Sequence, residues 1–133
     1  MFTLLFIIYS CTDEVEYPNY ATFEKTSSDV GVPPNSEVVE SIIIYTGNIT
    51  GNDRNIDVII DEDASTISSS AYSIPSSITI PANKNVASLD ITFKDEGLDI
   101  ATDKTLVLRL KGSDDFYVGE EITLNVSKVC DSG

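Results

Sequence analysis

The sequence predicts an all-β protein that folds as an antiparallel two-sheet sandwich of about seven strands. Three observations lead to this fold class. About seven short segments alternate apolar and polar side chains with a period of two, which is the pattern of strands with one buried face. Turn-forming residues separate these segments at intervals of roughly 8–15 residues. No segment keeps a helical period with capping residues at both ends.

The alternation is clearest in residues 87–93, where Leu89, Ile91 and Phe93 share one side of the strand. Another segment ends at Pro81, which suits a strand at the edge of a sheet. Residues 65–70 are rich in serine and are expected to form a loop. The predicted strands are residues 20–25, 38–45, 56–62, 78–80, 87–93, 106–111 and 122–127.

The N-terminal residues resemble a bacterial lipoprotein signal. The apolar run 2–9 is far shorter than the roughly 20 residues that cross a bilayer, but it has the length of the apolar region of a secretory signal. The run leads into a tetrapeptide ending at Cys11 that resembles a lipobox, the motif whose cysteine carries the lipid after cleavage. No Lys or Arg precedes the run, and Tyr9 is bulky for its position. A buried N-terminal strand is therefore the alternative.

The acidic residues 13–16 resemble the export tag of Bacteroidetes surface lipoproteins. We therefore expect a protein anchored in the outer membrane, with its domain at the cell surface or in the periplasm. The chain has room for one domain. The expected segments are a signal peptide over residues 1–10, the lipidated Cys11 with a flexible tether over 11–19, the sandwich over 20–129 and a tail over 130–133.

The net charge of the chain limits the classes of partner that it can bind. Eight basic and 22 acidic residues give a net charge of −14. This field repels a phosphate backbone, which argues against a nucleic-acid partner. It also repels anionic lipid head groups, so attachment to the membrane is expected through the lipid on Cys11 rather than through a basic surface. The remaining partner classes are an extracellular protein or a glycan.

The chain lacks the residues that most catalytic sites need. It has no His and no Trp, which excludes His-based triads and His-ligated zinc. Cys130 has no partner thiol if Cys11 is lipidated, and it is expected to be free. The only enzymatic alternative is a small glycan-processing enzyme with a carboxylate pair. The candidate pairs are Asp61 with Asp95, and Glu62 with Glu96.

Residues 22–127 resemble a Calx-beta-type domain. The resemblance rests on the order of several short stretches, namely residues 71–75, 78–82, 89–91, 94–96 and 103–110. It implies an immunoglobulin-like sandwich of the kind that is common in extracellular proteins, including small Bacteroidetes surface lipoproteins.

The same resemblance implies a calcium site, because calcium-binding members of the family hold the ion between loops at one end of the sandwich. Two departures weaken this implication: Ala71 replaces an expected acidic ligand, and Lys94 places a competing cation in the acidic cluster. A weak site, with a Kd of about 10⁻⁴–10⁻³ M, is one interpretation. Solvated loop carboxylates are the other. The candidate ligands are Glu24, Asp61, Glu62, Asp63, Asp95, Glu96 and Asp99.

Tyrosines matter because sugar-binding faces often use them. Tyr45, Tyr72 and Tyr117 are expected to be partly buried packing residues, whereas Tyr17 and Tyr20 flank the tether and can be exposed. Together these features predict a non-enzymatic cell-envelope lipoprotein that displays a β-sandwich for interaction, adhesion or accessory binding. A calcium-binding module is the alternative.

Overall fold

The computed structural model describes residues 20–100, 102–112 and 117–129, and within them the chain forms ten strands and one short 3-10 helix. The elements are β1 (Tyr20–Phe23), β2 (Ser27–Val32), β3 (Glu37–Thr46), β4 (Arg54–Ile60), η1 (Ser69–Ala71), β5 (Tyr72–Ser73), β6 (Ser77–Ile80), β7 (Val86–Lys94), β8 (Lys104–Leu110), β9 (Tyr117–Val118) and β10 (Ile122–Lys128). The predicted signal peptide, Cys11 with its tether and Cys130 lie outside the described residues.

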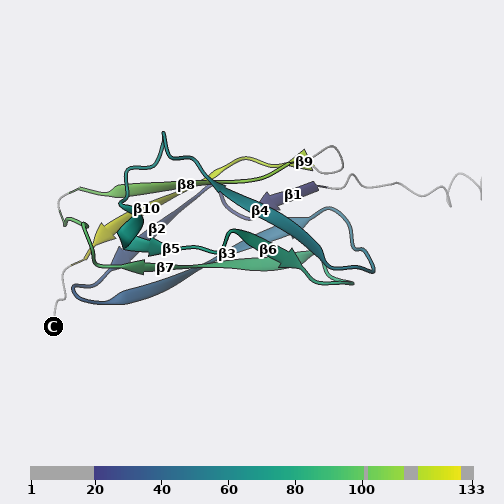
Figure 1. Cartoon of the computed structure of the whole chain (residues 1–133), viewed down its shortest axis with the longest axis horizontal. Coiled ribbons are helices and arrows are strands. Elements are labelled where there is room, and N and C mark those ends of the chain that lie inside the picture. The colour runs from purple at the N-terminus through teal and green to yellow at the C-terminus, as the bar shows by residue number, and fades with distance from the viewer. Residues whose placement is uncertain (1–19, 101, 113–116, 130–133) are drawn as a thin grey trace, which may run out of the picture.

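The strands build two five-stranded sheets that pack face to face (Figure 1). The first sheet has the order β5-β7-β3-β1-β9, and the second has the order β2-β10-β8-β4-β6. The fold class predicted from the sequence is therefore confirmed. Among the described residues, no helix is long and apolar enough to cross a membrane.

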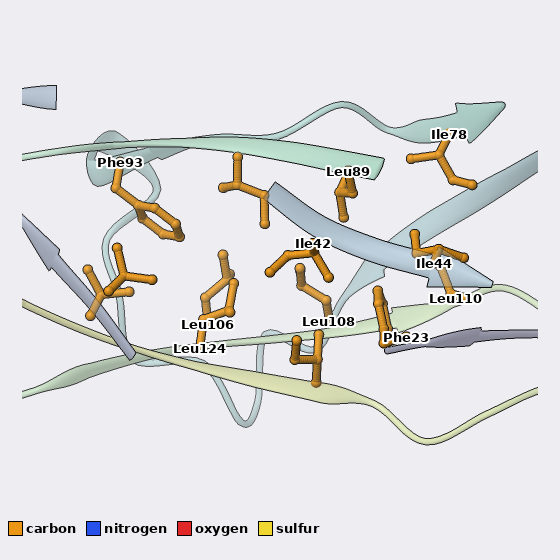
Figure 2. Packing of buried hydrophobic residues seen from close by; sticks show 14 of the residues in the cluster. Phe23, Ile42, Ile44, Ile78, Leu89, Phe93, Leu106, Leu108, Leu110 and Leu124 are labelled. Carbon is orange, nitrogen blue, oxygen red and sulfur yellow. The ribbon is translucent and has the colours of Figure 1, made fainter. Parts of the chain in front are cut away.

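Side chains that alternate inward from both sheets form one core (Figure 2). Leu89, Ile91 and Phe93 of β7 are fully buried, as are Leu106 and Leu108 of β8 in the facing sheet. Each such side chain contributes roughly 1.5–3 kcal/mol when it leaves water. The period of two in these strands therefore positions both sheets and supplies most of the stabilising free energy.

β2 has no counterpart among the predicted strands. The chain leaves the first sheet after Phe23 and enters the second at Ser27, so the predicted strand 20–25 ends earlier than expected. β2 then pairs in parallel with β10, and β1 pairs in parallel with β9. The other pairings are antiparallel. The N-terminal segment is thus divided between the two sheets, and each sheet has one parallel strand pair at its edge, whereas the other pairs are antiparallel.

The segment that follows β4 is more structured than a serine-rich loop. The N–H of Asp61 donates to the carbonyl of Val107 (2.9 Å), and the N–H of Val107 donates to Ser65 Oγ (2.9 Å). Val107 is buried, although the alternation of β8 predicts that it faces water. The segment is therefore a loop that hydrogen bonds hold along β8 until it reaches η1.

Candidate functional site

Three tyrosines lie exposed on neighbouring strands of the first sheet. Tyr117 of β9 is 71% exposed, Tyr45 of β3 is 41% exposed and Tyr20 of β1 is 36% exposed. We call these three residues the tyrosine face. Aromatic rings at a surface provide an apolar body with a polar hydroxyl, which is why tyrosine is enriched at binding surfaces.

The strand registers place these rings together. Tyr20 pairs with Tyr117 across the parallel β1–β9 ladder, and Thr22 pairs with Tyr45 across the antiparallel β1–β3 ladder. Val86 of β7 pairs with Tyr45 on its other side and is 38% exposed. Since neighbouring strands lie about 4.8 Å apart, the rings share one continuous patch on the outer side of the sheet.

A hydrogen bond holds one ring of the tyrosine face. The hydroxyl of Tyr45 donates to Oε2 of Glu24 (3.3 Å). The negative charge of Glu24, together with this hydrogen bond, raises the pKa of Tyr45 above its ordinary value. Tyr45 therefore stays neutral at physiological pH, with its ring position restrained from one side.

The predictions for the tyrosines are confirmed in part. Tyr20 is exposed, as the sequence allowed, and Tyr72 is half-buried. Burial and the nearby Glu62 raise the pKa of Tyr72. The prediction was wrong for Tyr117, which is the most exposed of the three rings in the tyrosine face. Tyr45 is 41% exposed and therefore partly buried, and it lies on the outer surface of the sheet. Tyr17 lies outside the described residues.

The predicted calcium ligands occupy two regions. Residues 61–63 and 95–99 follow the ends of β4 and β7. Both segments lie toward the end of the sandwich opposite the start of β1 (Figure 1), and we call this end the acidic pole. Glu24 lies elsewhere: its N–H donates to the carbonyl of Ile43, six residues along β3 from Glu37 at the acidic pole. At about 3.3 Å per residue, Glu24 is roughly 20 Å from the pole.

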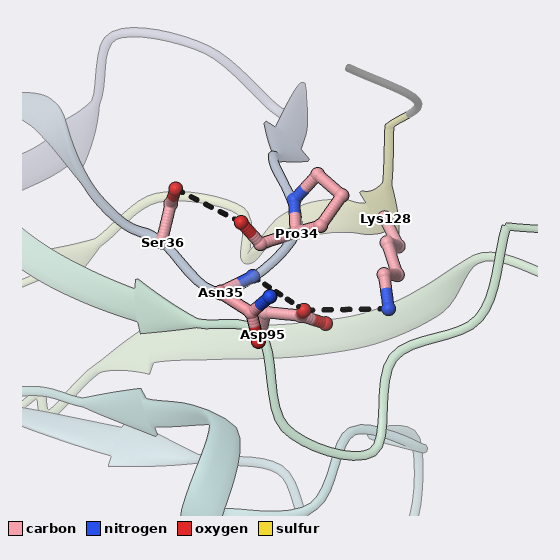
Figure 3. Close-up of polar contacts among 5 residues, drawn as sticks. All are labelled: Pro34, Asn35, Ser36, Asp95 and Lys128. Carbon is pink, nitrogen blue, oxygen red and sulfur yellow. Dashed lines mark hydrogen bonds and ion pairs between the residues drawn. The ribbon is translucent and has the colours of Figure 1, made fainter.

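Within the acidic pole, two carboxylates have other partners, and Figure 3 shows those of Asp95. Oδ2 of Asp95 accepts a hydrogen bond from the N–H of Asn35 (2.8 Å) and lies 3.3 Å from Nζ of Lys128. Oδ1 of Asp61 accepts from the N–H of Ala64 in its own turn (3.2 Å). Across residues 20–100, 102–112 and 117–129, no three His, Cys, Asp or Glu side chains are grouped so that they could hold a metal ion. Calcium binding stays a prediction.

A small cavity of about 30 Å³ opens where the chain crosses between the sheets. Glu24, Glu40, Ile43 and Ile122 are among its lining residues, and Ser28 Oγ donates to Oε2 of Glu40 beside it (2.9 Å). A space of this size holds about one water molecule. The tyrosine face therefore remains the more extensive candidate for binding a macromolecule.

Residues 23–129 match the family described as a domain of unknown function, DUF4843. The chain belongs to the DUF4843 family. No curated protein sequence matches this DUF4843 chain significantly.

Solved structures share the fold of this DUF4843 domain. A protein of unknown function from Bacteroides ovatus matches 81% of the chain with a TM-score of 0.67 and 18% identity, and the match covers 44% of that protein. A proposed carbohydrate-binding protein from Bacteroides ovatus matches 81% with a TM-score of 0.64 and 10% identity, covering 36% of that protein. The DUF4843 chain thus spans less than half the length of either.

The apo form of the Calx CBD1 domain is also similar in fold. It matches 86% of the DUF4843 chain with a TM-score of 0.61 and 14% identity, and 99% of that domain is covered. These neighbours support a Bacteroidetes-type β-sandwich with the Calx-beta fold, as the resemblance in sequence implied. At such identities the likeness extends to the fold alone.

Proposed function

We propose that this chain is a non-enzymatic binding module of the bacterial cell envelope, held to the outer membrane through a lipid on Cys11, and that its tyrosine face binds a neutral extracellular glycan. The observation that carries the proposal is the exposure of three tyrosines on adjacent strands β9, β1 and β3. The tetrapeptide ending at Cys11 supports the anchor.

The chemistry of the patch favours a sugar. Sugar rings present apolar C–H faces that stack on aromatic rings, and their hydroxyls can bond the phenolic oxygens. Around the three tyrosines, the paired positions add the uncharged Thr22 and Val86, and Glu24 beside Tyr45 adds a negative charge that repels anions. The net charge of −14 disfavours an anionic ligand. The fold likeness to a proposed carbohydrate-binding protein supports the same ligand class.

Binding can be measured by affinity electrophoresis of the full chain in gels that contain neutral polysaccharides, with an acidic polysaccharide for comparison. Each of Tyr20→Thr, Tyr45→Thr and Tyr117→Thr should weaken retention by about 3- to 10-fold, because one stacking ring is lost. Threonine suits a strand, so the fold should persist. The triple variant should migrate as it does without polysaccharide.

Val39→Thr is the matched control. Val39 is 61% exposed and lies on β3, six residues from Tyr45 and outside the tyrosine face, so its replacement should leave retention unchanged. Equal retention of the wild type and the triple variant on every neutral polysaccharide would contradict the proposal. So would wild-type retention on the acidic polysaccharide alone, which would point to an anionic glycan instead.

A further inference from the structure

The Calx-beta resemblance implies a calcium ion at the acidic pole, and the residues there can be compared with the ligands that this ion requires. Calcium requires six to eight oxygen ligands that converge at 2.3–2.6 Å. Glu24 bonds Tyr45 on the tyrosine face, and the Asp61 carboxylate bonds the backbone of its own turn. Glu24 is therefore directed away from a shared site, and one oxygen of Asp61 already has a partner.

The side chain of Asp95 is nearly enclosed, since only 8% of it is exposed. Oδ2 of this residue receives both the N–H of Asn35 and the ammonium of Lys128. One of the two carboxylate oxygens that could bind a metal is thus engaged by a donor and by a cation. A calcium ion brought to this oxygen would be repelled by the ammonium.

The contacts around Asp95 join three segments of the chain (Figure 3). The N–H of Asp95 donates to the carbonyl of Ser36 (3.2 Å), so Asp95 bonds the β2–β3 turn through both its backbone and its side chain. Asn35 sits in this turn with a φ of 57°, a conformation that non-glycine residues seldom adopt. Lys128, the last residue of β10, contacts the same carboxylate through its ammonium.

Backbone bonds hold Lys128 in place. Its own N–H donates to the carbonyl of Asp99 (3.5 Å), and the next N–H, of Val129, donates to the carbonyl of Val32 (3.0 Å). The β2–β3 turn, the segment after β7 and the end of β10 therefore meet around one carboxylate. The ammonium of Lys128 can therefore hold the three segments together through the carboxylate of Asp95.

We infer that the ammonium of Lys128 supplies, from within the chain, the positive charge that a metal ion would supply at this pole. The acidic pole is then a metal-independent clasp that joins the β2–β3 turn to the segment after β7 and the end of β10. This inference is independent of the tyrosine face.

The test is thermal unfolding of the full chain in detergent, with EDTA, with about 2 mM Ca²⁺ and with about 2 mM Mg²⁺. The wild type should unfold at the same temperature in all three. Lys128→Met should lower the midpoint by roughly 2–5 °C, as expected for a partly exposed ion pair in a domain of this size. Lys128→Arg keeps the positive charge and should lower the midpoint by a smaller amount.

Lys111→Met is the matched control, because Lys111 is exposed at the far end of β8 and outside the clasp. It should leave the midpoint unchanged. Asp95→Asn combined with Lys128→Met should cost less than the sum of the two single changes, since both remove the same interaction. A rise of several degrees for the wild type in Ca²⁺ but not Mg²⁺ would overturn the inference. Equal midpoints for Lys128→Met and Lys111→Met would overturn it as well.

Discussion

Asp95 should make the stability of the protein depend on pH in the acidic range. The hydrogen bond from the N–H of Asn35 lowers its pKa, burial opposes this effect, and Lys128 lowers the pKa further. The pKa in the folded state therefore lies below the unfolded value of about 4. Stability from this group is fully present above the unfolded pKa and is lost as the pH falls through the folded pKa.

The measurement is the unfolding midpoint of the wild type and of Asp95→Asn between pH 7 and pH 2. The wild type should lose stability more steeply below about pH 4, because only its Asp95 must take up a proton there. Two curves that stay parallel through this range would show that Asp95 does not contribute to the acid transition.

Single residues also show how much of the structure the sequence could predict. Tyr45 is out of phase with the buried Ile42 and Ile44, and this local signal could have placed it on the outer surface. Lys94 was the cation that the sequence placed among the acids, but the structure pairs Asp95 with Lys128. That pairing follows from where β10 ends in the folded chain, which no local pattern encodes.

At the scale of an element, β9 depends on one glycine. The N–H of Gly119 donates to the carbonyl of Ala21 on β1 (2.9 Å). A Cβ at Gly119 would overlap Oγ1 of Thr22 and come within 2.8 Å of its Cβ. The absence of a side chain thus permits the close approach of the two backbones.

Gly119→Ala should therefore destabilise the domain by about 1–3 kcal/mol, in the range seen for overpacked sites. Urea unfolding measures this change, and Gly51→Ala is the control because no atom lies within 4 Å of the added Cβ. The variant should also bind polysaccharide less well, since β9 carries Tyr117 beside Tyr20. Superimposable urea curves for the two glycine variants would show that the overlap is relieved at no cost.

The strands differ in how well the sequence predicts them. β7 and β8 have apolar residues at three or more alternate positions, and both were predicted, although Val107 of β8 is buried between two of them. β2 contains only Val30 and Val32 as buried apolar residues, together with Gly31, and its strand conformation comes from pairing with β10. β5 and β9 have two residues each, too few for any periodicity. Short strands are set by their distant partners.

At the scale of the whole molecule, the proposed lipid anchor has a direct test. Expressed in a bacterial host that processes lipoproteins, the protein should begin at Cys11 and carry the added mass of a lipid. It should also partition with membranes, because several acyl chains on one cysteine hold it durably. Cys11→Ser should be found in the soluble fraction at the mass of its unmodified chain. An unmodified Cys11 in the membrane-associated protein would contradict the anchor.

The position of Tyr20 has a mechanical consequence. Tyr20 belongs to the tyrosine face and is also the first residue of β1, the strand that follows the proposed tether. A glycan bound at this face and a membrane attached through Cys11 would together place a load on β1, which lies between β3 and β9. Lengthwise pulling strains all the hydrogen bonds of a ladder at once, whereas peeling breaks them singly. The load on β1 would thus be shared with β3 and β9 and, because the chain continues from β1 into β2, with the second sheet as well.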